Sequence, residues 1–569
     1  MKSSTVKNIR TQGNIIVDNI VVAIAQQLST NRTIGWMIGF VAVAYSLMVR
    51  SDLYIGSDPA FYYITAEKIL QGKHYYYNFF ESNFPLNFYI YTIPVLISHI
   101  TGISAITAIL LFTTIVALTS IYCSSLLLKT TSIYQDGILY NFIIAGLFFG
   151  HFTPFSTFPN NEIGTKTLLY LAFILPYFFY VLTEIENIFL SKSTATIIGI
   201  FAGLVVAIKP HYALFIIFME LYILWRKKSL WYSLRPVNFA IVLVNIIHLL
   251  WLILFLPEYL FKVLPMVAVS YEGVSYEGVI EGIHFFRLIL LREWLIIIFL
   301  VIAYKKFPRS EINNVLLVAV IASMAIFGSE GLGTWDQVSV LYFFNNLLLI
   351  KIVIDFIRSH MLLKIYIKAL LILITSFFVF IFVFNLVPIQ RYFKLYHSII
   401  VMVEQISPLE PVLFLSDRIF APINLYTGLP DDSKMPALSF WRGMQNNKND
   451  ADKTNNLKKK QIVQQTEKYF MDAINEALYH NPKMVFVSNR VKWGQLRDRC
   501  AIPNLDIFLE NQTFRNKWRD YFFYTTIVEM DDKNLITDNI AVYIRRDNEY
   551  YWGATYLPKA IPLLNGYVL

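Results

Sequence analysis

SDPAFYYITAEKILQG, at residues 57–72, begins a few residues after a hydrophobic segment at 33–49. That segment is long and apolar enough to be a candidate for the first membrane span. The carboxylate of Asp58 therefore stands close to the point where the chain leaves the bilayer, and an aromatic amphipathic stretch follows it. This arrangement predicts an active site at a membrane surface.

The composition is typical of a polytopic membrane protein. Of the 569 residues, 56% are hydrophobic and 15% are charged, whereas an average soluble domain has about 25% charged residues. The formal charge of +9 could indicate a nucleic-acid partner, but the basic residues fall in short clusters between apolar runs. Such clusters set membrane orientation. We therefore expect a lipid bilayer, and no nucleic acid, as a partner.

Apolar segments long enough to cross a membrane recur along the first two thirds of the chain. A span needs about 20 apolar residues, and fewer where helices are short and packed inside protein. By this measure we predict eleven spans, near 33–50, 104–128, 138–155, 167–190, 194–208, 211–225, 237–256, 288–304, 313–328, 338–357 and 366–387. A further segment, 85–100, could either cross or lie along the surface.

The positive-inside rule decides between these two topologies. If 85–100 does not cross, the basic clusters at 226–235, 305–309 and 358–368 share the side of the basic N-terminus. If it crosses, all three move to the other side. We therefore expect eleven crossings and an extracytoplasmic C-terminus, with most acidic residues of the connecting loops on the outer face.

The predicted fold class is mainly α, a polytopic membrane helical bundle with a C-terminal extracytoplasmic α/β domain. After about residue 387 the chain becomes polar, and β-like runs accompany a charged helical stretch. The runs lie at 412–416, 484–488, 525–529 and 540–544, and the helix at 458–480. The predicted domains are a cytoplasmic segment at 1–32 with an interfacial helix at 15–28, a transmembrane domain at 33–387 with a first outer loop at 51–103, and the α/β domain at 388–569.

Asp58 has two compatible interpretations. With Pro59 after it and Gly72 just past the last periodic residue, it matches the start and end signals of a helix. The same carboxylate could act as a general base that takes a proton from an acceptor hydroxyl. Glu162, in the short loop before the span near 167, is predicted on the same face. It is either a partner of Asp58 or a solvated loop acid.

Lys209, Pro210 and His211 interrupt an otherwise apolar stretch at 195–225. An ionisable residue at such a break usually faces a cavity or a partner, and a phosphate is a natural counter-ion for Lys209. The alternative is a snorkelling lysine in a tight helical hairpin. His211 alone is more often a hydrogen-bonded packing residue than a ligand.

The loop at 257–287 contains a tandem repeat, SYEGV at 270–274 and again at 275–279. Its tyrosines, such as Tyr271, suit stacking against a sugar, although a small duplication in a loop explains the repeat equally well and is the reading we favour. Arg287 and Arg292 flank the next span and could hold a phosphate through two hydrogen bonds each. Interfacial anchoring is the alternative for both arginines.

Several common cofactor signals are missing from the sequence. The two cysteines, Cys123 and Cys500, give neither a disulfide framework nor a metal cluster. There is no Gly-rich phosphate loop, nucleotide-binding fingerprint or zinc-ligand spacing. We expect no certain cofactor and no ATP-driven chemistry, while two outer-face carboxylates leave room for a divalent cation.

In their order, these features resemble the GT-C membrane glycosyltransferases, specifically the bacterial relatives of the protein O-mannosyltransferases and the lipid A aminoarabinose transferases. The resemblance covers residues 33–387. It is carried by the stretches at 57–72 and 80–89, by Asn161 and Glu162 before LPY at 175–177, by IKPH at 208–211, and by LPEYL at 256–260 with Pro265 and Tyr271.

The resemblance implies an inverting hexosyl- or pentosyltransferase of the bacterial inner membrane. Its donor would be a sugar on a polyprenyl phosphate, and its acceptor an envelope lipid, glycan or protein. By the same resemblance Asp58 is the catalytic base with Glu162 as its partner. Lys209, Arg287 and Arg292 would bind the donor phosphate, and the predicted substrate contacts are Tyr62, Glu81, His211 and Tyr271.

The chain departs from the family pattern in two places. The usual pair of acids in the first loop is here a single Asp58 followed by Pro59, and GTWDQ at 333–337 replaces a common Tyr-His pair.

Two other function classes stay open. A transporter or flippase of lipid-linked sugars would favour charges deep in several spans and related halves. A non-catalytic membrane scaffold that displays the C-terminal domain is the third class.

Overall fold

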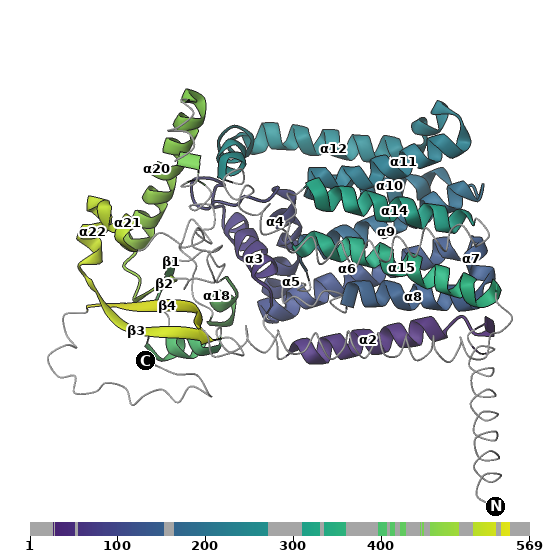
Figure 1. Cartoon of the computed structure of the whole chain (residues 1–569). Coiled ribbons are helices and arrows are strands. Elements are labelled where there is room, and N and C mark those ends of the chain that lie inside the picture. The colour runs from purple at the N-terminus through teal and green to yellow at the C-terminus, as the bar shows by residue number, and fades with distance from the viewer. Residues whose placement is uncertain are drawn as a thin grey trace, which may run out of the picture. The chain divides into compact units, whose positions relative to one another are not determined.

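Figure 1 shows the computed structural model of the chain. It describes residues 27, 29–51, 55–152, 164–270, 310–329, 335–359, 397–406, 410–415, 421–427, 444, 447–448, 456–488, 505–530 and 536–546. Several predictions lie outside these residues: Glu162, Tyr271, Arg287, Arg292, Cys500, the spans at 288–304 and 366–387, and nearly all of the interfacial helix at 15–28.

The chain divides into two compact units. The helical unit comprises Met1–Leu53, Phe112–Ile247 and Glu281–Ile389, and the mixed unit comprises Tyr54–Leu111, His248–Ile280 and Gln390–Leu569. The first loop and the C-terminal region thus fall in one unit, although residues 112–389 lie between them in the sequence.

Every predicted span within the described residues coincides with a helix. These helices are α2 (Ile34–Ser51), α6 (Ala105–Leu128), α8 (Gly137–Phe152), α9 (Lys166–Ile185), α10 (Lys192–Ile208), α11 (Ala213–Lys227), α12 (Pro236–Phe255), α14 (Glu311–Ser329) and α15 (Trp335–Ser359). Four of the described helices, α6, α9, α12 and α14, are long and apolar enough to cross a membrane. The protein is therefore mainly helical and carries the elements of a membrane protein.

Close glycine contacts bring neighbouring helices of the helical unit together. A Cβ atom at Gly35 of α2 would lie 2.5 Å from the carbonyl oxygen of Asn141 in α8, and one at Gly199 of α10 would lie 2.3 Å from that of Val237 in α12. Gly39 and Gly203, one turn further along, make similar contacts. Pairs of small residues four apart are a common packing device of membrane helices.

Polar contacts join the ends of several helices at one end of the helical unit, which we call the polar end. Arg32 donates to the carbonyl oxygen of Tyr134 at 3.2 Å, next to the start of α2. The hydroxyl of Tyr222, near the end of α11, donates to Glu311 at the start of α14 at 3.1 Å. Asn313 of α14 donates to Asp355 near the end of α15 at 3.2 Å.

The positive-inside prediction places these same helix ends on one side of the membrane. Successive spans cross a membrane in opposite directions. The prediction therefore expects one end of the bundle to contain the start of α2, the end of α11, the start of α14 and the end of α15. Within the helical unit, the contacts at the polar end join the end of α11 to the start of α14, and the start of α14 to the end of α15. The topology itself stays a prediction. These contacts do not depend on which side of a bilayer the polar end occupies.

The mixed unit combines helices of the first loop with a small sheet. Its elements include α3 (Ser57–Leu70), α4 (Leu86–Ile90), α5 (Thr92–Thr101), the π-helical turn η3 (Tyr259–Val263), α18 (Ala421–Thr427), α20 (Leu457–Tyr479), α21 (Leu505–Glu510) and α22 (Gln512–Trp518). The segment predicted at 85–100 is thus two short helices. Its apolar character does not decide whether it crosses a membrane.

The sheet has the strand order β1-β2-β4-β3. Its strands are β1 (Val412–Leu415), β2 (Met484–Ser488), β3 (Tyr521–Met530) and β4 (Ile536–Arg545). β1 pairs with β2 in parallel, and β4 pairs antiparallel with both β2 and β3. The four strands coincide with the predicted β-like runs, and α20 with the predicted helix.

One hydrophobic core joins the first loop to the C-terminal region within the mixed unit. Phe80 and Phe88 of the loop belong to the same buried cluster as Tyr259 of η3 and Phe470 of α20. Tyr76 stacks on Tyr469 of α20 with ring centroids 4.8 Å apart. The C-terminal residues are therefore part of the body that holds α3.

Candidate active site

The Asp58 carboxylate lies in the first turn of α3. The helix begins at Ser57, its N-cap is Gly56, and no side chain caps it. The prediction that Asp58 is the N-cap, with Pro59 as the first helical residue, is therefore wrong by two positions. Gly72, with φ +76°, does follow the C-cap as predicted. Without a capping role, the half-buried carboxylate of Asp58 has a different partner.

That partner is Tyr62, one helical turn further along α3. Its hydroxyl donates to Oδ2 of Asp58 at 3.3 Å. The Tyr62 side chain is fully buried, and its ring packs edge to face on Tyr91 with centroids 5.4 Å apart. Because a buried ring has little rotamer freedom, Tyr62 orients the carboxylate and does not itself offer a surface to a substrate.

The C-terminal region also contacts the start of α3. The hydroxyl of Tyr426 in α18 accepts a hydrogen bond from the backbone N–H of Ile55 at 3.2 Å. Burial raises the pKa of Tyr426, so the phenol stays protonated and keeps its own donor. This bond fixes the backbone three residues before Asp58.

Glu81 is almost fully buried in the first loop. Its Oε1 accepts from the backbone N–H and the side-chain amide of Asn83, both at 2.7 Å, and from the hydroxyl of Ser82 at 3.3 Å. The hydroxyl of Tyr75 donates to the Glu81 carbonyl oxygen. These local bonds shape the turn before α4, so one carboxylate oxygen of Glu81 is used by the loop itself.

A second group of polar residues lies in the helical unit, where the sequence predicted a break at Lys209. Lys209 has the extended conformation that a residue before proline prefers, with φ −157° and ψ 112°. α10 therefore ends at Ile208, and a short 3-10 turn, η1 (Pro210–Tyr212), leads into α11. The Lys209 ammonium lies 6.0 Å from the centre of the Tyr212 ring.

The start of α9 brings further donors to this turn. The rings of Tyr170 in α9 and Tyr212 in η1 lie 4.2 Å apart, and both side chains are fully buried. Thr167 lies one turn before Tyr170 on the same helix face and is buried as well. Within the described part of the chain, the hydroxyls of Tyr170 and Thr167 have no hydrogen-bond partner. Such buried polar atoms are costly unless something binds them.

His211 lies in η1 beside Lys209, and Lys166 is close enough to act on it electrostatically. Its ring lies 4.8 Å from the Tyr212 ring, centre to centre. We call Lys166, Thr167, Tyr170, Lys209 and His211 the lysine cluster. It has two lysine ammonium groups, an imidazole and two buried hydroxyls.

The structure thus places the predicted site residues in two groups. Asp58, Tyr62 and Glu81 belong to the mixed unit, and Lys209 and His211 belong to the helical unit. Among the described residues, no group of three or more His, Cys, Asp or Glu side chains could hold a metal ion. The divalent cation suggested by the sequence stays a prediction.

Sequence reasoning missed four residues of these groups for different reasons. Thr167 and Lys166 precede an apolar run, and their pairing with the Lys209 break could have been suspected from the antiparallel arrangement of two successive spans. Tyr170 looks like any aromatic residue of a span. Tyr426 contacts Ile55, which lies 371 residues away in the sequence. No local sequence pattern predicts such a contact.

No model of a known protein family matches this chain, and neither does any curated protein.

Proposed function

We propose that this protein is a membrane glycosyltransferase that moves a sugar from a polyprenyl-phosphate donor to an envelope acceptor. Its place would be the bacterial inner membrane, with eleven crossings and the reaction at the extracytoplasmic face. The observation that carries the proposal is the Asp58 carboxylate, held at the start of α3 by the buried hydroxyl of Tyr62. A fixed, partly exposed carboxylate is suited to act as a general base.

The proposed reaction is a single displacement at the anomeric carbon. Asp58 takes the proton of the acceptor hydroxyl as its oxygen forms a bond to C1 of the sugar. The bond between C1 and the phosphate oxygen breaks, and its electron pair stays on the phosphate. The leaving group gains one negative charge, so cations beside it stabilise the transition state more than the ground state.

The lysine cluster supports the second half of this reaction. Lys166 and Lys209 supply the two positive charges, and the buried hydroxyls of Thr167 and Tyr170 can donate to phosphate oxygens. A polyprenyl phosphate would bring its own hydrocarbon chain into the apolar surroundings of these helices.

A transporter is the second function class that the sequence left open. Buried charges do occur in α9, α11 and α15, at Glu184, Glu220, Lys351 and Asp355. Each of them has an oppositely charged partner close by: Glu184 and Glu220 both pair with Arg235, and Lys351 pairs with Asp355 one turn further along α15. Charges that are paired in this way are already neutralised within the bundle, so they favour a rigid bundle over a transport pathway.

The test compares cells that carry altered chains. Lipid-linked sugars and envelope glycans are profiled by mass spectrometry in cells with the wild-type chain, without it, or with Asp58→Asn. The matched control is Glu67→Gln on the same helix, where Glu67 pairs with His99 at 3.4 Å. The proposal expects the donor to accumulate in the deletion and in Asp58→Asn, but not in Glu67→Gln. Identical profiles with and without the chain would refute the proposed function.

A further inference from the structure

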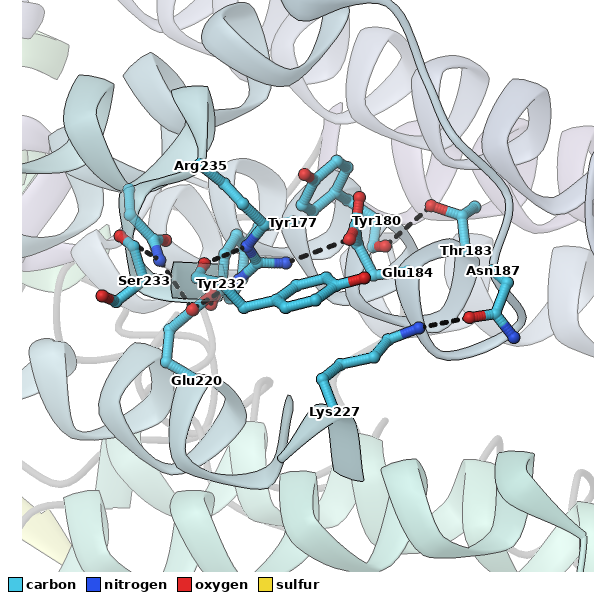
Figure 2. Close-up of polar contacts among 11 residues, drawn as sticks. Tyr177, Tyr180, Thr183, Glu184, Asn187, Glu220, Lys227, Tyr232, Ser233 and Arg235 are labelled. Atoms are coloured by element: carbon cyan, nitrogen blue, oxygen red, sulfur yellow. Dashed lines mark hydrogen bonds and ion pairs between the residues drawn. The ribbon is translucent and has the colours of Figure 1, made fainter. Parts of the chain in front are cut away.

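The inference begins with a network of buried charges at the polar end of the helical unit (Figure 2). Arg235, just before α12, forms ion pairs with Glu220 of α11 at 2.5 Å and with Glu184 of α9 at 3.4 Å. Tyr177 and Asn238 each donate to Glu220 at 2.7 Å. The three charged side chains are at most 14% exposed, so their ion pairs are little screened by solvent.

The same network fixes two short loops to each other. One loop, 186–191, joins α9 to α10, and the other, 228–235, joins α11 to α12. Lys227 donates to Asn187 at 2.6 Å, and its ammonium lies 5.5 Å from the centre of the Tyr232 ring. The Arg235 guanidinium contacts the same ring at 5.9 Å. We call these two segments the interface loops.

The interface loops expose large apolar side chains although the network beneath them is rigid. Phe189 is 78% exposed, Leu230 79%, Trp231 80% and Leu234 70%. Four such residues in two short loops would be unfavourable on a soluble surface, since each one leaves its apolar area in water. Tryptophan in particular is enriched where a membrane meets water.

Two lysines accompany this apolar surface. Lys192 and Lys228 are exposed, and neither forms an ion pair with any residue that the structure describes. The other cations nearby are already used, since Arg226 pairs with Glu311 and Arg235 with two glutamates. Glu186 is also part of the interface loops, and its carboxylate accepts hydrogen bonds from the backbone N–H and the hydroxyl of Ser132. With Lys192 and Lys228 set against Glu186, the remaining charge at the interface loops is net positive.

We infer that the interface loops are a built-in anchor that inserts into the headgroup layer of an anionic lipid leaflet. Leu230, Trp231 and Leu234 enter the boundary between headgroups and acyl chains, and Lys192 and Lys228 lie at the level of the lipid phosphates. The Arg235 network holds both loops at a common depth. This inference does not depend on the proposed enzymatic activity.

The experiment measures the depth of a label in lipid nanodiscs. The full chain, with Cys123→Ala and Cys500→Ala, receives an environment-sensitive fluorophore at Trp231→Cys, or at Phe189→Cys if the first variant does not fold. The matched control carries the label at Tyr479→Cys in the mixed unit, where Tyr479 is 71% exposed. Spin-labelled lipids quench the fluorophore in discs of phosphatidylcholine with or without phosphatidylglycerol.

The expected result is strong quenching at position 231 by lipids labelled near the headgroup, and little quenching at 479. Phosphatidylglycerol should increase the quenching, and Lys192→Gln combined with Lys228→Gln should weaken the preference for anionic lipid on the order of tenfold. Equal quenching at 231 and 479 would overturn the inference. So would a label at 231 that is shielded by protein and insensitive to lipid, since a second copy or another protein would then cover the loops.

Discussion

The position of the Asp58 carboxylate depends on side chains that lie both near and far in the sequence. Tyr62 lies one turn away and could be anticipated from helical spacing once α3 was predicted. Tyr426 could not, because its contact with Ile55 forms only when the C-terminal region packs on α3. The exact first residue of a helix could not be predicted from the sequence either, since the N-cap of α3 is Gly56 and not Asp58.

The Tyr426 contact predicts a local effect of losing one hydroxyl. Tyr426→Phe keeps the ring and removes the acceptor of the Ile55 N–H. Hydrogen exchange should therefore quicken at the amides of residues 55–60, while amides in β2 keep their rates. The mixed unit should stay folded, because one neutral hydrogen bond contributes only about 1 kcal/mol. Unchanged exchange at 55–60 would show that Tyr426 does not hold this segment.

At the scale of elements, periodicity and composition predicted most of the described helices and all four strands. Apolar length alone is a strong signal for a membrane helix, and short β-rich runs in a polar region are a clear one for strands. The sequence did not reveal which helices pack closely. Close packing depends on which glycines face the backbone of a neighbouring helix. A single sequence does not show which side of a helix faces a neighbour.

Glycine contacts give a prediction about helix packing. Gly35→Ala should lower the melting temperature, because its Cβ would lie 2.5 Å from the carbonyl oxygen of Asn141 and α2 would have to move away from α8. Gly328→Ala in α14 is the matched control, since no atom lies within 4 Å of the position of its Cβ. Alanine also favours a helix over glycine by about 1 kcal/mol, so the control should be neutral or stabilised. A stabilised Gly35→Ala would contradict the described packing.

At the scale of the whole molecule, each compact unit is built from segments that are not consecutive in the sequence. The first loop was predicted with the membrane bundle, and the C-terminal region as a domain of its own. The contacts instead place 54–111 with 390–569 in the mixed unit. Local patterns cannot show this grouping, because it arises from a shared core that includes Phe80 and Phe470.

The proposed topology predicts the side on which the chain ends. The helix ends that meet at the polar end carry basic clusters, so they should face the cytoplasm. With eleven crossings, a reporter fused after Leu569 should then be active in the periplasm. A phosphatase fusion and a fluorescent-protein fusion at the same site report the two sides independently. A cytoplasmic signal from both fusions would exclude an odd number of crossings.

Transfer kinetics in liposomes test the role of Asp58 most directly. The purified chain is supplied with the polyprenyl-phosphate sugar that accumulates in cells lacking it. Asp58→Asn should lower kcat by about 100-fold or more with an unchanged donor KM, as expected for a general base. Lys209→Met should lower kcat as well as raise the donor KM, because in the proposal Lys209 both binds the donor phosphate and stabilises the charge that develops on it. A normal kcat for Asp58→Asn would contradict the assignment of this carboxylate as the base.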